Sequence, residues 1–263
     1  MEQVRFKRKT VDLDEMEKQQ NKKRFRRNVF YTFLFLFILL LFLSTAFFVF
    51  FRVKDIAVTG NSVYSDEEIL LSSGVEKNKN MFSFSEKEIS ENIKSALPYV
   101  GKVTVERNLP SGITIKIEEK KAVMYSYING EYYLFSDDLY VLGVTAKKSS
   151  VPGGAIELIT GSVDRCLVGQ PITFMDARTR DSILEMYSVL KANEMEYLIK
   201  KIDISARFDI SMQYTDRFRV YIGDINNFDL KIPFLAKVIE ELYDEDKGSI
   251  DLSSHKEATV ALE

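Results

Sequence analysis

The chain has 263 residues, a formal net charge of −3 and a hydrophobic content of 46%. Its charge is unevenly distributed, because residues 1–28 carry ten basic and five acidic residues, whereas the remainder carries 26 basic and 34 acidic ones. The acidic bulk argues against binding of nucleic acid, or of anionic lipid, through charge alone.

Residues 29–51 form a run of 23 residues without a charge. As a helix this run is roughly 35 Å long at about 1.5 Å per residue, which is enough to cross a hydrocarbon core of about 30 Å. A cleaved signal peptide is the alternative, but its apolar region would be shorter and would end at small residues. This run ends in Phe47-Phe-Val-Phe-Phe51, so we expect a retained transmembrane helix.

Charged residues flank the run asymmetrically. Five basic residues lie within residues 22–27, while Arg52, Lys54 and Asp55 follow the run. Because cytoplasmic flanks of membrane helices are enriched in Lys and Arg, this asymmetry predicts a cytoplasmic N-terminus and an extracytoplasmic part over residues 52–263. Residues 1–28 show no apolar period, so we expect a basic cytoplasmic tail that is disordered or only transiently helical.

The segment from residue 52 to residue 122 begins with one strand and two helices. Residues 53–59 alternate between the two faces of a strand and end at Gly60-Asn61, a turn signal. Ser65-Asp-Glu-Glu68 and Ser85-Glu-Lys-Glu88 are capping-box patterns that each predict a helix start. Gly74 is expected to close the first helix, and Pro98 to end the second.

Two alternating runs complete this segment. Val103 and Val105 share one face, and Ile113, Ile115 and Ile117 share another. The residues between the runs, Asn108–Gly112, have the chemistry of a hairpin turn. The order strand, helix, helix, strand, strand predicts a small α+β module with two helices on one face of a three-stranded sheet.

Residues 123–263 predict a second, mostly antiparallel α+β domain. Its first part, Tyr125–Leu142, is rich in aromatic residues and is divided by the turn signals Asn129-Gly130 and Asp137-Asp138, which indicates a meander. Residues 151–169 are expected to be rich in loops. Asp176 is expected to cap a helix that runs to about Asn193.

The rest of this domain alternates strands with one more helix. Alternation over residues 208–214 and 218–222 indicates two strands. A helix is expected from about Pro233 to Tyr243, with Phe234, Val238 and Leu242 buried. A final strand is predicted over Ala258–Leu262.

No motif in the chain indicates catalysis, a cofactor or a metal. The only histidine, His255, cannot make the usual zinc site, and the only cysteine, Cys166, is better explained as a small buried hydrophobe than as a reactive thiol. Pro152-Gly153-Gly154 lacks the Gly-Lys-Ser ending of a phosphate-binding loop. Paired carboxylates for glycoside hydrolysis stay open, because their separation is a spatial property. We predict a protein that is not an enzyme and that holds no cofactor.

The layout resembles the bacterial cell-division proteins of the FtsQ/DivIB family. The resemblance begins with the short basic tail and the single anchor. It continues with Phe51-Arg-Val-Lys-Asp-Ile-Ala-Val-Thr-Gly-Asn61, Tyr64-Ser-Asp-Glu-Glu-Ile-Leu70, and Leu97-Pro-Tyr-Val100 followed by Val103-Thr-Val-Glu-Arg-Asn-Leu-Pro110. It extends through Tyr133-Leu-Phe-Ser-Asp137, Arg219-Val-Tyr-Ile-Gly223 and Gly248-Ser-Ile-Asp-Leu252. The ordered set, rather than any single motif, implies a POTRA module over residues 52–122 and a β-rich domain over residues 123–263.

The resemblance also implies partners and a surface that binds them. Proteins of this family are non-enzymatic parts of the division machinery and bind bitopic coiled-coil proteins of the FtsL and FtsB/DivIC type at the septum, where the partner pairs with the terminal strand. Transferred to this chain, that surface is Ser254, Lys256, Glu257, Ala258, Thr259, Val260 and Leu262. A last strand at a sheet edge can accept a strand from another chain. The alternative is that this strand is a covered edge or an inner strand.

Two other classes of function are kept open. A membrane-anchored enzyme or ligand sensor acting on the cell wall would need a concave pocket within residues 123–263, lined by converging carboxylates. A POTRA-bearing translocation factor would be distributed evenly around the cell and would bind unfolded exported chains.

Overall fold

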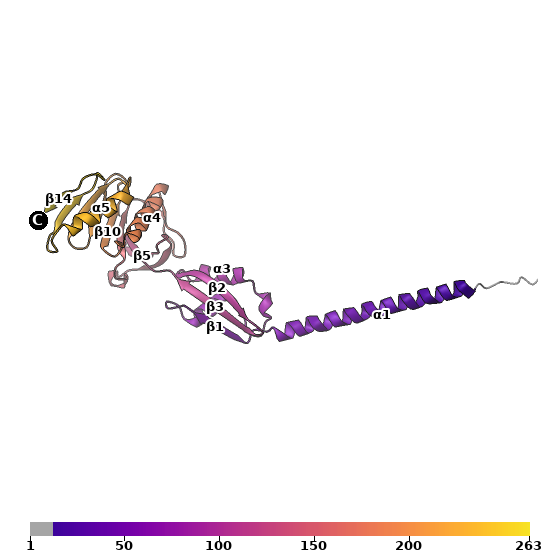
Figure 1. The fold of residues 1–263 in the computed structure, drawn as a ribbon. Helices are drawn as coiled ribbons and strands as arrows, with labels where there is room; N and C mark the ends of the chain where they lie inside the picture. Colours follow the sequence, from indigo (N-terminus) through magenta and orange to yellow (C-terminus); the bar gives the residue numbers. More distant parts are fainter. Residues whose placement is uncertain (1–12) are drawn as a thin grey trace, which may run out of the picture. The chain divides into compact units, whose positions relative to one another are not determined.

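In the computed structural model, which describes residues 13–263 and their side chains from residue 21 onward, the first element is the helix α1, Leu13–Phe50 (Figure 1). Within its segment Asn21–Phe50, an 18-residue stretch has a mean hydropathy of 2.9, so the segment is long and apolar enough to cross a membrane. The helix starts well before the predicted 29–51, because residues 13–28, which were expected to be disordered or only transiently helical, are helical. This polar stretch is rich in Lys, Arg, Glu and Gln, which favour helix. The tail residues 1–12 lie outside the described residues.

The chain divides into two compact units. The first contains α1 and continues to Asp55, and it includes the segments Glu76–Ser83 and Arg107–Ile113. The second contains Ile56–Val75, Phe84–Glu106 and Thr114–Glu263.

The α+β module after the membrane helix forms as predicted. Its sheet has the order β1-β3-β2, from β1 (Asp55–Thr59), β2 (Val100–Asn108) and β3 (Gly112–Glu119). Its helices are α2 (Asp66–Ser73) and α3 (Glu86–Ala96), which pack together, and a 3₁₀ turn, η1, covers Met81–Ser83. The α+β fold class is confirmed.

Only one of the two capping boxes forms. At α2, the Ser65 hydroxyl accepts a hydrogen bond from the backbone N–H of Glu68, and the Glu68 carboxylate accepts one from the backbone N–H of Ser65. Gly74 ends the helix with a positive φ of 71°. At α3, Ser85 is the N-cap residue but its side chain makes no capping hydrogen bond. The helix start predicted from Ser85-Glu-Lys-Glu88 is therefore confirmed. The capping hydrogen bond predicted for the Ser85 side chain is wrong.

The second domain is built on a nine-stranded mixed sheet of order β14-β13-β12-β11-β10-β7-β4-β5-β6 (Figure 1). Five of its eight strand pairs are antiparallel, and β12–β13, β10–β7 and β4–β7 are parallel. The strands are β4 (Met124–Ile128), β5 (Glu131–Phe135), β6 (Val141–Thr145), β7 (Ile156–Thr160), β10 (Ile199–Ile204), β11 (Ile210–Tyr214), β12 (Phe218–Gly223), β13 (Gly248–Asp251) and β14 (Thr259–Leu262). A separate pair joins β8 (Val163–Arg165) to β9 (Thr173–Phe174), and a 3₁₀ turn, η2, covers Lys148–Ser150.

Two helices lie on the same face of this sheet (Figure 1). Helix α4 (Ala177–Ala192) starts at the predicted cap, where Asp176 accepts from the N–H of Arg178, and it buries the predicted stripe of Ile183, Tyr187 and Leu190. Helix α5 (Phe228–Glu240) buries Phe228, Ile232 and Leu235. One continuous apolar core joins these helices to the sheet.

Three expectations for this domain are wrong. The stretch 151–169, expected to be rich in loops, contains β7, a strand inside the sheet. Strand β11 begins at Ile210, and Phe208 before it is 73% exposed. Helix α5 begins five residues before Pro233, so this proline lies inside the helix, and Phe234 and Val238 are only partly buried.

Candidate partner-binding site

The predicted terminal strand exists and lies at an edge of the nine-stranded sheet. Strand β14 pairs only with β13, antiparallel, with Ile250 opposite Val260 and Ser249 opposite Ala261. The strand begins at Thr259 rather than at the predicted Ala258. In the described part of the chain, no strand pairs with the outer side of β14.

Backbone hydrogen bonds of β13 determine which backbone groups of β14 point outward. Gly248 and Leu252 donate toward β12, to the carbonyls of Arg217 and Tyr221 at 3.0 and 2.7 Å. The backbone groups of Ser249 and Asp251, which alternate with these residues, therefore face β14. The N–H of Glu263 donates to the carbonyl of Lys247 at 3.0 Å. Since neighbouring residues of a strand direct their backbone groups to opposite sides, Thr259 and Ala261 bond inward.

The N–H and C=O groups of Val260 and Leu262 consequently point away from the sheet. Their side chains differ in burial, because Val260 packs against the core while Leu262 is 54% exposed. Thr259 and Ala261 are exposed. The edge therefore offers two outward backbone positions and an exposed leucine to an incoming strand.

The other predicted site residues lie in the loop before β14. Ala258 is partly buried and packs against the core, whereas Lys256 and Glu257 are exposed. The hydroxyl of Ser254 accepts a hydrogen bond from the N–H of Lys256 at 3.2 Å. The structure thus places Ala258, Thr259, Val260 and Leu262 in one line, with Ser254, Lys256 and Glu257 on the approach to it.

Asp251 holds the beginning of this loop. Its carboxylate accepts a hydrogen bond from the backbone N–H of Ser253 at 2.8 Å. That bond, together with one from the Ser253 side chain, lowers the pKa of Asp251 below its ordinary value of 3.8. The charged form of Asp251 therefore favours the turn that leads to β14.

Sequence reasoning missed the glycine that lets β14 lie close to β13. Gly248 has a φ of 148°, and a Cβ at this position would lie 2.0 Å from the carbonyl oxygen of Ala261. No side chain fits there without displacing β14. The available signal was a glycine within a strand-like stretch, which often marks a close backbone approach.

A buried lysine, also missed, anchors α5 to the end of β12. Lys231 is 1% exposed, and its Nζ donates to the carbonyls of Ile222 at 2.7 Å and Asp224 at 3.2 Å. Burial lowers the pKa of Lys231, and the Asp224 carboxylate at 3.8 Å opposes that shift. No local pattern indicated this burial, because a lysine within an apolar helix pattern is usually exposed.

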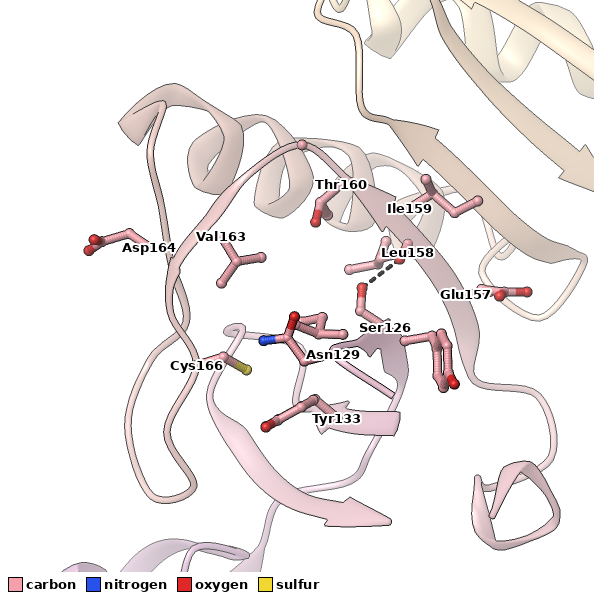
Figure 2. Close-up of a pocket in the computed structure, with 13 residues that line it drawn as sticks. Ser126, Asn129, Tyr133, Glu157, Leu158, Ile159, Thr160, Val163, Asp164 and Cys166 are labelled. Atoms are coloured by element: carbon pink, nitrogen blue, oxygen red, sulfur yellow. Dashed lines mark hydrogen bonds between the residues drawn. The ribbon is translucent and has the colours of Figure 1, made fainter. Parts of the chain in front are cut away.

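The second domain also contains a cleft of about 620 Å³, the feature that an enzyme would need (Figure 2). Its lining includes Ser126, Tyr133, Thr160 and Cys166, with the carboxylates of Glu157 and Asp164. Those two carboxylates lie on opposite sides of the cleft and point away from each other (Figure 2). This arrangement does not provide the converging pair that the enzyme hypothesis requires.

Two potential nucleophiles of this cleft, Ser126 and Cys166, are not activated. The Ser126 hydroxyl donates to the carbonyl of Leu158. Burial raises the pKa of the Cys166 thiol to about 11, so the thiol stays protonated at neutral pH. Among the residues that the structure describes, no group of His, Cys, Asp and Glu is placed to hold a metal ion.

Comparison with known proteins agrees with this architecture. The family model for the FtsQ-type POTRA domain matches residues 51–120. The chain is 24% identical to the cell division protein DivIB of Clostridium botulinum (strain Hall) over 92% of this chain and 94% of the relative. It is 26% identical to DivIB of Clostridium tetani, covering 78% of this chain and 77% of the relative, and 24% identical to DivIB of Bacillus subtilis, covering 95% and 96%. The chain thus contains an FtsQ-type POTRA domain and is similar over most of its length to bacterial cell-division proteins named DivIB.

Proposed function

We propose that this membrane-anchored division protein is a non-enzymatic scaffold that stabilises the septal division complex. It binds bitopic proteins of the FtsL and FtsB/DivIC type through its extracytoplasmic part. The single observation that carries the proposal is the exposed edge at β14, where no described strand pairs with the outward backbone groups of Val260 and Leu262. A strand from a partner chain can extend the sheet at such an edge, with main-chain hydrogen bonds giving affinity and side chains giving selectivity.

The proposed orientation places the N-terminus in the cytoplasm. Its support is the cluster of basic residues at 22–27 before the apolar helix. The POTRA module and the second domain then lie outside the membrane, on the side where the septal wall is built. The protein accordingly concentrates at the division septum.

The decisive test is a proline at the outward position. Proline has no N–H, so Val260→Pro removes one outward donor without removing a hydrogen bond to β13. Val260→Ala is the matched control, because it shortens the same side chain and keeps the N–H. Each full-length variant is reconstituted in nanodiscs, and its affinity for the FtsL-type and FtsB/DivIC-type partners is measured.

We expect Val260→Pro to weaken binding by about tenfold or more, which corresponds to about 1.4 kcal/mol. Val260→Ala should stay close to the parent protein. Equal binding by the parent and a folded Val260→Pro variant would show that the strand assignment is wrong. Ala261→Pro serves as a reference for a detached strand, because it breaks an inward bond to β13.

Position in the cell tests the broader role. A fluorescent fusion at the N-terminus should form a band at mid-cell during constriction. Depletion of the FtsL-type partner should disperse the band. An even distribution in dividing cells would instead favour the translocation factor, and loss of function after a carboxylate-to-alanine change at Glu157 or Asp164 would favour an enzyme.

A further inference from the structure

The outer end of α1 is capped by a segment distant in the sequence. The last carbonyls of a helix have no partner within the helix. Here the side-chain amide of Asn80 donates to the carbonyl of Phe47 at 3.2 Å, and the N–H of Met81 donates to that of Phe51 at 2.9 Å. At membrane depth such groups need protein partners, because lipid tails offer none.

Aromatic contacts join the same segment to the helix. The Phe82 ring stacks on Phe47, with centroids 5.2 Å apart and an interplanar angle of 25°. It also meets Phe51 edge-on at 5.4 Å. The Arg107 guanidinium lies 5.8 Å from the centre of the Phe82 ring. Phe82 is therefore held between the end of the apolar helix and a basic side chain.

This packing determines how deep Phe82 lies relative to the membrane. Phe47 lies four residues before the end of the uncharged run, which is roughly 6 Å along the helix axis. A ring in contact with both Phe47 and Phe51 must lie close to the boundary between lipid tails and headgroups. Nevertheless, 46% of Phe82 is exposed, and that exposed surface adjoins a helix whose apolar side chains are themselves exposed.

A second segment adds another exposed apolar side chain. The carbonyl of Ser111 accepts hydrogen bonds from the N–H groups of Lys54 and Asp55, just beyond the helix. Two residues before Ser111, the side chain of Leu109 is 62% exposed. The turn that carries Leu109 is thus bonded to the first residues after the membrane run.

The charge of these segments suits lipid headgroups. Residues 52–55, 76–83 and 107–113 contain five basic and two acidic residues. The rest of residues 52–263 contains 21 basic and 32 acidic residues. The basic residues of the extracytoplasmic part are thus enriched in the three segments nearest the end of α1.

We propose that residues 76–83 and 107–113 form a membrane-surface collar, in which Phe82 and Leu109 enter the interfacial layer of the outer leaflet. Arg52 and Arg107 lie among the headgroup phosphates, whereas Lys79 is paired with Glu76 at 2.6 Å. The occupant of this surface is the lipid bilayer, because the surface is continuous with the membrane-spanning helix. The collar does not depend on β14 or on partner proteins.

The chain contains no tryptophan, which permits a direct test. Phe82→Trp and Leu109→Trp each introduce a single reporter, and Tyr243→Trp supplies a control at a 77% exposed position of the second domain. Each full-length variant is reconstituted in phosphatidylcholine vesicles with lipids brominated close to the headgroup. Tryptophan emission is excited at the red edge of its absorption, which spares the tyrosines.

We expect blue-shifted emission and strong quenching by the brominated lipid for Phe82→Trp and Leu109→Trp. Tyr243→Trp should be quenched by aqueous acrylamide and not by the lipid. Circular dichroism first confirms that each variant is folded, and Leu109→Trp keeps the proposal testable if Phe82→Trp is not. A folded collar variant that behaves like Tyr243→Trp would overturn the proposal, whatever the partner-binding result at β14.

Discussion

The two edge strands of the nine-stranded sheet, β6 and β14, differ in whether other residues bond to their outer side. At β6, the N–H of Val141 donates to the carbonyl of Gln170 and its carbonyl accepts from Gly169, both at 2.9 Å. The hydroxyl of Tyr140 also donates to the carbonyl of Gly169. At β14, no described element pairs with the outward groups of Val260 and Leu262.

The difference separates a protected edge from an available one. An uncovered edge strand is a template for pairing with another chain, and folded proteins usually cover or shorten it. Here the chain uses a loop to occupy part of the β6 edge and leaves β14 with four paired residues. The same sheet therefore shows both solutions, and the exceptional edge is the candidate site.

Among the changes that would alter the difference between the two sheet edges, Gly248→Ala is expected to have the largest effect. The new methyl group would meet the Ala261 carbonyl, and the backbone at φ 148° disfavours a side chain, at a cost of about 1–3 kcal/mol. We expect β14 to detach, which hydrogen exchange of its amides in the full-length protein would show as lost protection. Partner binding should fall with it.

Gly153→Ala is the control for that change. Apart from its two neighbours in the chain, no described residue lies within 4 Å of the place that a Cβ would take at Gly153, so this variant should keep the protection of β14. Unchanged exchange in Gly248→Ala would mean that β13 and β14 do not approach as closely as described.

A smaller effect is expected at the protected edge from Tyr140→Phe. This change removes the hydroxyl that binds Gly169 and keeps the ring over which Lys120 Nζ lies at 4.1 Å. Loss of one such hydrogen bond costs about 1 kcal/mol. Amides of β6 should exchange faster while those of β14 do not change. Tyr197→Phe, at a 78% exposed position, should leave both edges as they are.

The smallest effect is expected from pH at Asp251. Because hydrogen bonds hold its folded pKa below 3.8, its contribution to stability is present above pH 3.8 and is lost as the pH falls through the folded pKa. Between neutral and acidic pH, the denaturation midpoint of the parent protein should therefore fall more than that of Asp251→Asn. Parallel pH profiles for the two proteins would contradict the role of Asp251.

Local chemistry made the membrane-proximal module predictable. Helix α2 combines a capping box at Ser65 with a closing Gly74, and β3 alternates cleanly through Ile113, Ile115 and Ile117. Each signal depends on neighbours in the sequence, and these signals were confirmed. The boundary proposed between residues 122 and 123 stays a prediction.

The strands that were missed depend on distant contacts. In β10, the apolar residues Ile199, Ile202 and Ile204 do not alternate, because a register irregularity lies between Ile199 and Lys201. Before β7, turn-like residues favoured a loop over the short apolar run that follows them. In the structure this run is a strand that pairs with β10 on one side and β4 on the other.

The site was predictable in position rather than in geometry. Resemblance indicated Ala258–Leu262, but only the pairing with β13 shows which backbone groups face outward. The close approach at Gly248 and the buried contacts of Lys231 arise from tertiary packing, so no local pattern could reveal them.

The short ladder between β14 and β13 has a consequence for motion. A terminal strand held on one side by four paired residues is the kind of element that opens by local unfolding well before the domain does. A strand bound on its free side would close that opening. Binding of a partner should then slow amide hydrogen exchange in β14 itself. The size of this effect depends on the lifetime of the complex and not only on its affinity.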